Sequence, residues 1–397
     1  MELKPPVKTA KPKDTAGGSI QDKMKAIEDE MAKMQYNKAT QHHYGLLKAK
    51  MSILKERLEK RASGGKKGEG FTVKKSGDAT VILIGFPSVG KSTLLNTMTN
   101  AASKTAAYAF TTLTVIPGLL EYNKAKIQIL DVPGILAGAA SGTGRGKEVI
   151  GVVRNADLVL FLIDVFEPQQ LEVLRAELHQ AGLRLNERKP DVVVKTKSRG
   201  GLSISSTVKL TKTNKETLAS VLRELRISNA DVVIRDDITV DQFIDAVEHN
   251  KHYVPAIVAL NKIDLSDEAI IKRAIEVVTE KGPHAGDSLK ISLNVDKPLL
   301  ISSSEHLGIE ELKKAIFNKL RFIRVYLKEI GKKPDYDEPM IMQDDSTVRD
   351  VCQKIHRDFI NKFKFAKIWG PSSKFPGQQF MLDHKLADED VLELHLR

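Results

Sequence analysis

A glycine-rich segment that ends in lysine and serine carries the clearest chemical signal in the chain. Residues 85–92 read GFPSVGKS, which matches the pattern G-x-x-x-x-G-K-S of a phosphate-binding loop. Gly85 and Gly90 allow backbone N–H groups to turn toward a phosphate, Lys91 can reach the β- and γ-phosphates, and the Ser92 hydroxyl can bind Mg2+. The predicted nucleotide contacts in this segment are Gly85, Phe86, Pro87, Ser88, Val89, Gly90, Lys91, Ser92 and Thr93.

Two later motifs complete the predicted nucleotide site, one at Mg2+ and the γ-phosphate and one at the base. Asp131 and Gly134 belong to DVPG, where the carboxylate would hold Mg2+ through water and the glycine N–H would contact the γ-phosphate. Asn261, Lys262 and Asp264 belong to NKID. The carboxylate of Asp264 can accept hydrogen bonds from the N1 and N2 hydrogens of guanine, a donor pair that adenine lacks. Each motif alone is weak, but their order after the phosphate loop predicts a guanine nucleotide.

Short apolar runs precede all three motifs, as expected for strands buried on both faces of a parallel sheet. Such runs occur at Ala79–Ile84, Ile127–Leu130, Leu158–Ile163, Ala256–Leu260 and Leu299–Ile301, and helical patterns at Val173–Ala181 and Ile309–Leu320 alternate with them. The alternation predicts an α/β fold with a mostly parallel, doubly wound sheet. Ligands bind at the carboxyl ends of the strands in such a sheet, where the three motifs lie.

The N-terminal part of the chain is basic and predicted to be helical. Residues 1–19 lack an apolar pattern and are predicted to be a disordered tail, whereas apolar residues repeat at helical spacing over 20–34 and 47–58. Between them, NKATQHHYG at 37–45 predicts a turn that folds two helices into a hairpin. Residues 1–77 hold 18 Lys and Arg against 9 Asp and Glu and so supply +9 of the net charge of +11. This segment is interpreted either as a hairpin docked on the rest of the chain or as a basic arm that touches nucleic acid.

One segment within the α/β region does not follow the alternation of strand and helix patterns. Residues 184–250 contain two short strand patterns, at 192–196 and 202–205, and a helical pattern at 215–225. The segment is too long for a loop inside a compact domain, so it is predicted to be an inserted subdomain.

The C-terminal residues predict a small α+β unit. Strand patterns occur at 340–342, 380–382 and 391–396, and one helix is expected from its cap Ser346 to Phe363. Trp369 is expected in the core of this unit, with a platform for stacking bases as the alternative.

The predicted organisation has five segments. These are a basic tail with a helical hairpin at 1–77, a first part of the α/β domain at 78–183, the insertion at 184–250, a second part of the α/β domain at 251–330, and the C-terminal unit at 331–397. Cys352 is the single cysteine, which excludes an internal disulfide and a cysteine-based zinc site. No run of about 18 apolar residues is present and the N-terminus lacks an apolar signal, so a cytoplasmic protein without a membrane span is expected.

Several segments taken together resemble one family. GFPSVGKS, YAFTTLTVIPG at 108–118, DVPGILAGAASGTGRG at 131–146 and NKID resemble the Obg superfamily of GTPases. The N-terminal NKATQHHYGLLKAKMSILKERLEK and the C-terminal FKFAKIWG and DHKLADEDVLEL narrow this resemblance, over nearly the whole chain, to the developmentally regulated GTP-binding protein family. The resemblance implies a P-loop GTPase G domain with an N-terminal helical hairpin, a small α+β insertion and a C-terminal TGS domain with a ubiquitin-like β-grasp fold.

The resemblance also implies roles for residues outside the three motifs. Thr112, beside Thr111, would be the switch threonine that closes on Mg2+ when the γ-phosphate is present, and Ser302 with Ser303 would contact the guanine base, where the family usually has Ser-Ala. The further nucleotide contacts are Asp131, Val132, Pro133, Gly134, Ile135, Asn261, Lys262, Asp264, Ser302 and Ser303. The expected Mg2+ ligands are Ser92, Thr112 and Asp131, and the candidate catalytic residues are Lys91, Thr112 and Gly134.

Ile135 bears on the rate of hydrolysis. In Ras-type proteins the residue after D-x-x-G is a glutamine that positions the attacking water, which an aliphatic side chain cannot do. Slow intrinsic hydrolysis of GTP to GDP and phosphate is therefore expected. The group that replaces this glutamine would come from the switch segment with Arg145, from a bound K+ ion or from a partner. Ser88 stands where some related GTPases use an asparagine to help bind K+, which weakens the proposal of a K+ ion.

The favoured interpretation is a Mg2+-dependent GTPase that acts as a ribosome- or RNA-associated switch in translation. One alternative is an adaptor that holds GTP or GDP and binds ribosomes or structured RNA with little turnover. Another is an RNA-dependent ATPase, against which NKID argues. The family resemblance further implies a cognate regulatory protein as a partner.

Overall fold

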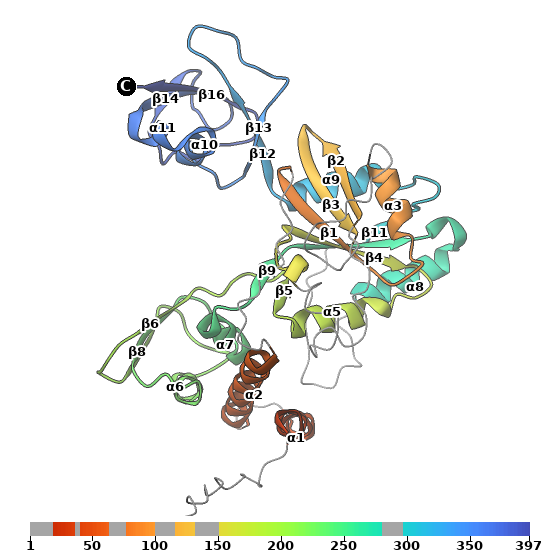
Figure 1. Cartoon of the computed structure of the whole chain (residues 1–397), viewed down its shortest axis with the longest axis vertical. Coiled ribbons are helices and arrows are strands. Elements are labelled where there is room, and N and C mark those ends of the chain that lie inside the picture. Colours follow the sequence, from red (N-terminus) through yellow and green to blue (C-terminus); the bar gives the residue numbers. More distant parts are fainter. Residues whose placement is uncertain (1–18, 36–39, 63–76, 100–115, 132–150, 280–296) are drawn as a thin grey trace, which may run out of the picture. The chain divides into compact units, whose positions relative to one another are not determined.

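The computed structural model describes residues 19–35, 40–62, 77–99, 116–131, 151–279 and 297–397 (Figure 1). Contacts between residues divide the chain into two compact units. One contains the N-terminal helices and residues 189–249, and the other contains the flanking α/β region and the C-terminal residues. None of the described helices is long and apolar enough to cross a membrane.

A six-stranded sheet forms the centre of the second unit. Its strand order is β11-β10-β4-β1-β3-β2, and every neighbouring pair is parallel except β2 with β3. The strands are β1 Ala79–Ile84, β2 Ile116–Tyr122, β3 Ala125–Asp131, β4 Leu158–Asp164, β10 Ala256–Asn261 and β11 Leu299–Leu300. The prediction of a mostly parallel α/β sheet is therefore confirmed.

Helices cover both faces of this sheet, and this explains the continuous apolar runs. Successive side chains of a strand point to opposite faces, so Val81 and Leu83 pack in one buried cluster while Ile82 and Ile84 pack in another. The first cluster includes residues of α3 Lys91–Met98 and α9 Ile309–Lys319, and the second includes residues of α5 Gln170–Gln180 and α8 Glu268–Thr279.

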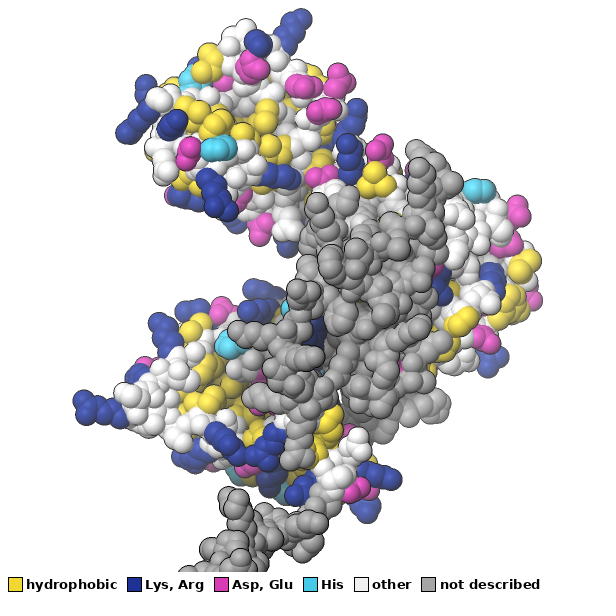
Figure 2. Space-filling model, in the orientation of Figure 1, with side chains coloured by type: hydrophobic (Ala, Val, Ile, Leu, Met, Phe, Trp, Pro, Cys, Tyr) yellow, Lys and Arg dark blue, Asp and Glu magenta, His cyan; other side chains and the backbone are white. Residues whose placement is uncertain are grey.

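The first unit joins segments that are far apart in the sequence. Helices α1 Ile20–Lys33 and α2 Gln41–Ala62 come from the N-terminal part, and β6 Val192–Thr196, β7 Leu202–Ser206, α6 Lys215–Glu224, β8 Ala230–Ile234 and α7 Val240–Glu248 come from the insertion. The three strands form a sheet in the order β6-β8-β7, and Ala49 of α2 lies in the same buried cluster as Leu218 and Phe243. Basic side chains project at the outer end of β6 and β8 (Figure 2).

The turn predicted at 37–45 is wrong for residues 41–45. Helix α2 begins at Gln41, so QHHYG is helical and His42 lies inside a helix, with its Nε2 3.0 Å from Ser220 Oγ. Gly45 serves close packing, because a Cβ atom there would lie 3.2 Å from Thr217 Cγ2 and 3.3 Å from Val240 Cγ1. Residues 36–39 lie outside the described part of the chain.

Two short parallel strands flank the insertion within the second unit. β5 Leu183–Leu185 pairs with β9 His252–Val254, and the residues 189–249 that belong to the first unit lie between these strands in the sequence. This pairing brings the two ends of the inserted segment together, as expected for a subdomain that leaves and rejoins one domain.

A five-stranded sheet with two helices forms the C-terminal part. Its order is β13-β12-β16-β14-β15. The elements are β12 Phe322–Leu327, β13 Met340–Gln343, α10 Val348–Ile355, α11 Arg357–Lys362, β14 Phe363–Trp369, β15 Gln378–Phe380 and β16 Asp390–Leu396.

Two sequence predictions for this part are wrong. The single helix expected from Ser346 to Phe363 is two helices, because His356 has an extended backbone between them, and the first is capped by Thr347. Phe363 begins β14 instead of ending a helix. Trp369 is only partly buried and does not belong to the domain core, whose members include Cys352 and Ile368.

Candidate nucleotide-binding site

The phosphate loop connects β1 to α3 at the carboxyl end of the sheet. Gly90 precedes the first residue of α3 with φ of 96°, and Ser88 has φ of 64°, so both adopt the left-handed region. A Cβ atom on Gly90 would lie 2.5 Å from Asn261 Nδ2, which excludes any other residue without rearrangement. The loop therefore places the amino end of a helix, with its free N–H groups, at the edge where a phosphate would bind.

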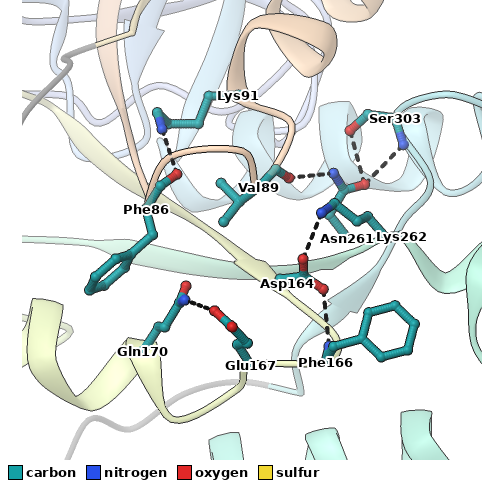
Figure 3. A network of polar contacts seen from close by, with 10 residues as sticks. All are labelled: Phe86, Val89, Lys91, Asp164, Phe166, Glu167, Gln170, Asn261, Lys262 and Ser303. Carbon is teal, nitrogen blue, oxygen red and sulfur yellow. Dashed lines mark hydrogen bonds and ion pairs between the residues drawn. The ribbon is translucent and has the colours of Figure 1, made fainter.

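Lys91 lies against this loop. Its Nζ donates a hydrogen bond to the carbonyl oxygen of Phe86 at 2.8 Å (Figure 3). It also donates to the carbonyl oxygen of Gly85 at 3.0 Å. Burial lowers the pKa of Lys91, and the charge of Asp131 partly opposes this shift. A phosphate bound at the loop would compete with the two carbonyl oxygens for the ammonium group.

Ser92 and Asp131 come together from α3 and β3. Ser92 Oγ donates to Asp131 Oδ2 at 3.3 Å, and Asp131 is 5% exposed. Its second oxygen, Oδ1, is buried without a hydrogen-bond partner among the described residues. Burial raises the pKa of Asp131, while Lys91 and Ser92 act in the opposite direction. An unsatisfied carboxylate oxygen beside a hydroxyl fits Mg2+, which prefers oxygen ligands and is commonly held by one carboxylate together with nucleotide phosphates.

Asn261 connects the phosphate loop to the loop that follows β11. Its Nδ2 donates to the Val89 carbonyl at 2.7 Å, and its Oδ1 accepts from both the backbone N and the Oγ of Ser303 at 3.0 Å (Figure 3). Asn261 is 2% exposed and Ser303 is 3% exposed. The amide thus fixes the relative positions of two loops, and Ser303 adds a hydroxyl hydrogen bond that alanine could not make.

Lys262 has a partner that the sequence analysis missed. Its Nζ lies 2.7 Å from Asp164 Oδ2, and Asp164 Oδ1 accepts from the backbone N of Phe166 at 3.0 Å (Figure 3). Asp164 and Asn261 are paired across β4 and β10. The sequence could have identified Asp164 by its position, because it is a carboxylate at the carboxyl end of a buried strand, as Asp131 is.

The remaining described base-contact candidates differ in exposure. Asp264 is exposed in the 3-10 turn Ile263–Leu265, where a base could meet its carboxylate. Ser302 is buried; its Oγ accepts from the backbone N of Glu305 at 3.1 Å and lies 3.2 Å from Ser304 Oγ. In the phosphate loop, Pro87 and Thr93 are exposed, whereas Val89 is buried.

Several candidate residues lie outside the described part of the chain. These are Thr111, Thr112, Val132, Pro133, Gly134, Ile135 and Arg145. Their predicted roles in binding Mg2+, the γ-phosphate or the attacking water remain predictions.

Comparison with known proteins assigns the class and then the family. Residues 80–197 match a family model described as 50S ribosome-binding GTPase, residues 199–322 match the C-terminal region of that domain, and residues 323–396 match the TGS domain. With the phosphate loop and NKID on this sheet, the chain is a GTP-binding protein of the P-loop GTPase class with a C-terminal TGS domain.

Similarity to individual relatives extends over nearly the full length of each chain. An uncharacterized GTP-binding protein of Methanocaldococcus jannaschii is 50% identical over 95% of this chain and 93% of its own. Human developmentally-regulated GTP-binding protein 2 is 41% identical over 94% of this chain and 99% of its own. The chain belongs to the developmentally regulated GTP-binding protein family.

Among solved structures, Aquifex aeolicus Era bound to GDP.AlF4- is similar to this chain with a TM-score of 0.34 and 20% identity. The similar regions cover 73% of this chain and 71% of that one. This similarity is too low to transfer a residue role or an activity.

Proposed function

We propose that this protein binds GTP and GDP with Mg2+, hydrolyses GTP slowly, and acts as a switch associated with ribosomes or RNA. The observation that carries the nucleotide and metal part is the buried Asp131 carboxylate beside Ser92 and close enough to Lys91 to influence its pKa. A cation at Asp131 would give the unsatisfied oxygen a partner, and a phosphate at the loop would give the partly buried ammonium group of Lys91 an anionic partner in place of two carbonyl oxygens.

The proposed base contacts come from two loops held by Asn261. Asp264 would accept from the guanine N1 and N2 hydrogens, and the loop with Ser302 and Ser303 would lie beside the base. Because Asn261 ties this loop to Val89, binding of the base and binding of the phosphates are expected to be coupled. Guanine over adenine selectivity should therefore depend on Asn261 as well as on Asp264.

The slow rate and the ribosome association rest on other observations. Ile135 replaces the glutamine that positions water in Ras-type proteins, and the excess of basic residues over 1–77 would favour contact with phosphate-rich RNA. The name of the matching family model, which mentions ribosome binding, agrees with this proposal. The same Ile135 supports a second candidate, an adaptor that holds the nucleotide and hardly turns it over.

Two measurements test the proposal: the first tests the nucleotide site, which both candidates share, and the second separates the switch from the adaptor. Binding of fluorescent GDP should fall at least tenfold in Lys91→Ala but stay unchanged in Lys272→Ala, a matched change at an exposed lysine of α8. GTP hydrolysis should then be measured with Mg2+ in Na+ and in K+, each with and without ribosomes. Stimulation by ribosomes supports the switch, whereas a rate near zero under every condition, with GDP and GTP still bound, favours the adaptor.

A further inference from the structure

The C-terminal sheet has two faces with different chemistry. On one face, Val325, Ala366, Ile368 and Leu392 belong to the buried core with residues of α10. Residues two apart on a strand share a face, so the residues between these point to the opposite side. This side also carries Arg324, Val391 and Glu393. The name aromatic–basic face is used for its residues Tyr326, Lys328, Phe365, Lys367, Trp369 and His395.

Strand register brings these residues together from three neighbouring strands. β14 and β16 are antiparallel, with Phe365 opposite His395 and Lys367 opposite Glu393. β12 runs parallel to β16 on its other side, and Lys328 follows its last residue. The face is therefore a continuous surface of the sheet rather than a set of scattered side chains.

Rings and cations on this face contact one another. The rings of Phe365 and His395 are stacked with centroids 4.3 Å apart and an interplanar angle of 20°. Lys328 Nζ lies 4.3 Å from the centroid of the Trp369 ring. These contacts hold the rings and an ammonium group at the surface in a fixed arrangement, which lowers the entropy lost when a planar ligand binds.

A buried carboxylate fixes the positions of the cations. The Glu393 side chain is 4% exposed and pairs with Lys328, while its Oε1 lies 2.7 Å from His395 Nε2 and 3.9 Å from Lys367 Nζ. Two lysines share this single carboxylate, so around Glu393 two positive charges face one negative charge. The Lys367 side chain is 34% exposed and so remains accessible to a ligand.

We propose that the aromatic–basic face binds single-stranded RNA, with bases stacked on its rings and phosphates paired with its lysines. This inference rests on the proposed RNA association and names a second surface, besides the basic residues of 1–77, that would contribute to it. Open sheet faces that combine aromatic rings with cations suit unpaired bases, because every base has a stackable π-face and its backbone is anionic. An acidic peptide would complement the lysines but would make little use of the four rings of Tyr326, Phe365, Trp369 and His395, so RNA is the favoured ligand.

Trp369 is the single tryptophan of the chain, so the intrinsic tryptophan fluorescence reports on this face alone. Fluorescence of Trp369 in the full-length protein should be quenched, saturably, by an unstructured single-stranded RNA of about 12 nucleotides. A duplex of the same length should quench at least fivefold less at equal concentration, since its bases are already stacked. Affinity should fall with rising salt, as expected where lysines displace cations from phosphates.

Three variants test the contribution of the face. Phe365→Leu keeps an apolar side chain and removes the ring, and should weaken RNA binding five- to tenfold. Lys367→Gln removes the more exposed lysine and should weaken binding about threefold and reduce its salt dependence. Lys385→Gln changes an exposed lysine outside the face and should have no effect. Circular dichroism and GDP binding should match the unsubstituted protein in all three.

The outcomes distinguish this inference from the function on which it rests. Binding of labelled RNA without a change in Trp369 fluorescence, and with equal affinity in all variants, would overturn the assignment to this face and leave RNA association intact. A failure to bind RNA or ribosomes at all would overturn both. Quenching by a glutamate-rich peptide but not by RNA would identify the face as a protein-binding surface and refute the RNA assignment.

Discussion

Replacement of Asp164 by asparagine should weaken guanine nucleotide binding even though Asp164 lies in none of the recognised motifs. Its carboxylate is 2.7 Å from Lys262 Nζ, and the two side chains are 14% and 30% exposed. Asparagine keeps an oxygen that can accept from the Phe166 N–H and removes only the charge. The variant therefore tests the ion pair with little change in shape.

The size of the effect follows from the loss of a fixed lysine. At 2.7 Å, two unit charges attract by about 6 kcal/mol at an effective dielectric constant near 20, most of which is offset by desolvation. In the variant, Lys262 is no longer held in place before the nucleotide binds. Ordering its side chain on binding then costs about 1.5–2 kcal/mol. The Kd for GDP should therefore rise about ten- to thirtyfold in Asp164→Asn.

The assay is a fluorescence titration with a labelled guanine nucleotide, followed by measurement of its dissociation rate. Most of the increase in Kd should appear as faster dissociation. Asp157→Asn is the matched control, because Asp157 lies just before the amino end of the same strand and its Oδ2 accepts from the Thr80 N–H at 2.9 Å. That change replaces a charged acceptor by a neutral one, so it should lower the free energy of unfolding by about 1 kcal/mol without altering nucleotide affinity.

A GDP affinity of Asp164→Asn within twofold of the unsubstituted protein would refute the reasoning, provided that the variant is folded. A second check is the double variant with Lys262→Met. If Asp164 acts only through Lys262, the double variant should bind GDP no more weakly than Lys262→Met alone.

Three further predictions concern the same site and the N-terminal helices. In Asp131→Asn, the affinity for GTP in Mg2+ should fall at least tenfold, while the affinity for GDP in EDTA changes little. In the unsubstituted protein, Mg2+ binding should be lost as pH falls through the raised pKa of Asp131, because protonation removes the metal ligand. Nucleotide titrations at several pH values would measure both effects. Ser303→Ala should lower the free energy of unfolding by about 1 kcal/mol. Asn261→Ala should lower it by about 2–3 kcal/mol, because the Val89 carbonyl and the Ser303 N–H both lose their partner. Equal losses of the two variants in urea denaturation would contradict this prediction. Gly45→Leu should lower the free energy of unfolding by about 1–3 kcal/mol through overpacking against Thr217, and a transition unchanged in urea would show that α2 can move away.

The sequence predicted the central sheet well because its strands are buried on both faces. The run ATVILI coincides with β1, since helices on both sides demand apolar residues at every position. β2 was not predicted, because Pro117 and Gly118 interrupt its apolar pattern. Here pairing with β3 stabilises a strand that local preference disfavours.

Predictions failed where a residue has more than one structural use. Gly45 was interpreted as part of a turn, but its small size lets α2 approach α6 and α7, a contact with residues more than 150 positions away that local sequence does not reveal. Trp369 was assigned to the core from its size, whereas the strand register places it on the opposite face. In the candidate site, each motif residue could be listed from the sequence, but the Lys262–Asp164 pair depends on the alignment of β4 with β10.

The core shared by α2 and the insertion has a consequence for the order of folding during synthesis. Helix α2 ends at Ala62, whereas α6 begins at Lys215, so the N-terminal helix leaves the ribosome well before its partner. At roughly 5–20 residues per second, the residues of α2 that contact the insertion wait about 8–30 s for their partner. Over that interval the side of α2 that packs on the insertion, around Gly45 and Ala49, stays uncovered and could be held by a chaperone, and truncated products that end before the insertion would keep it exposed.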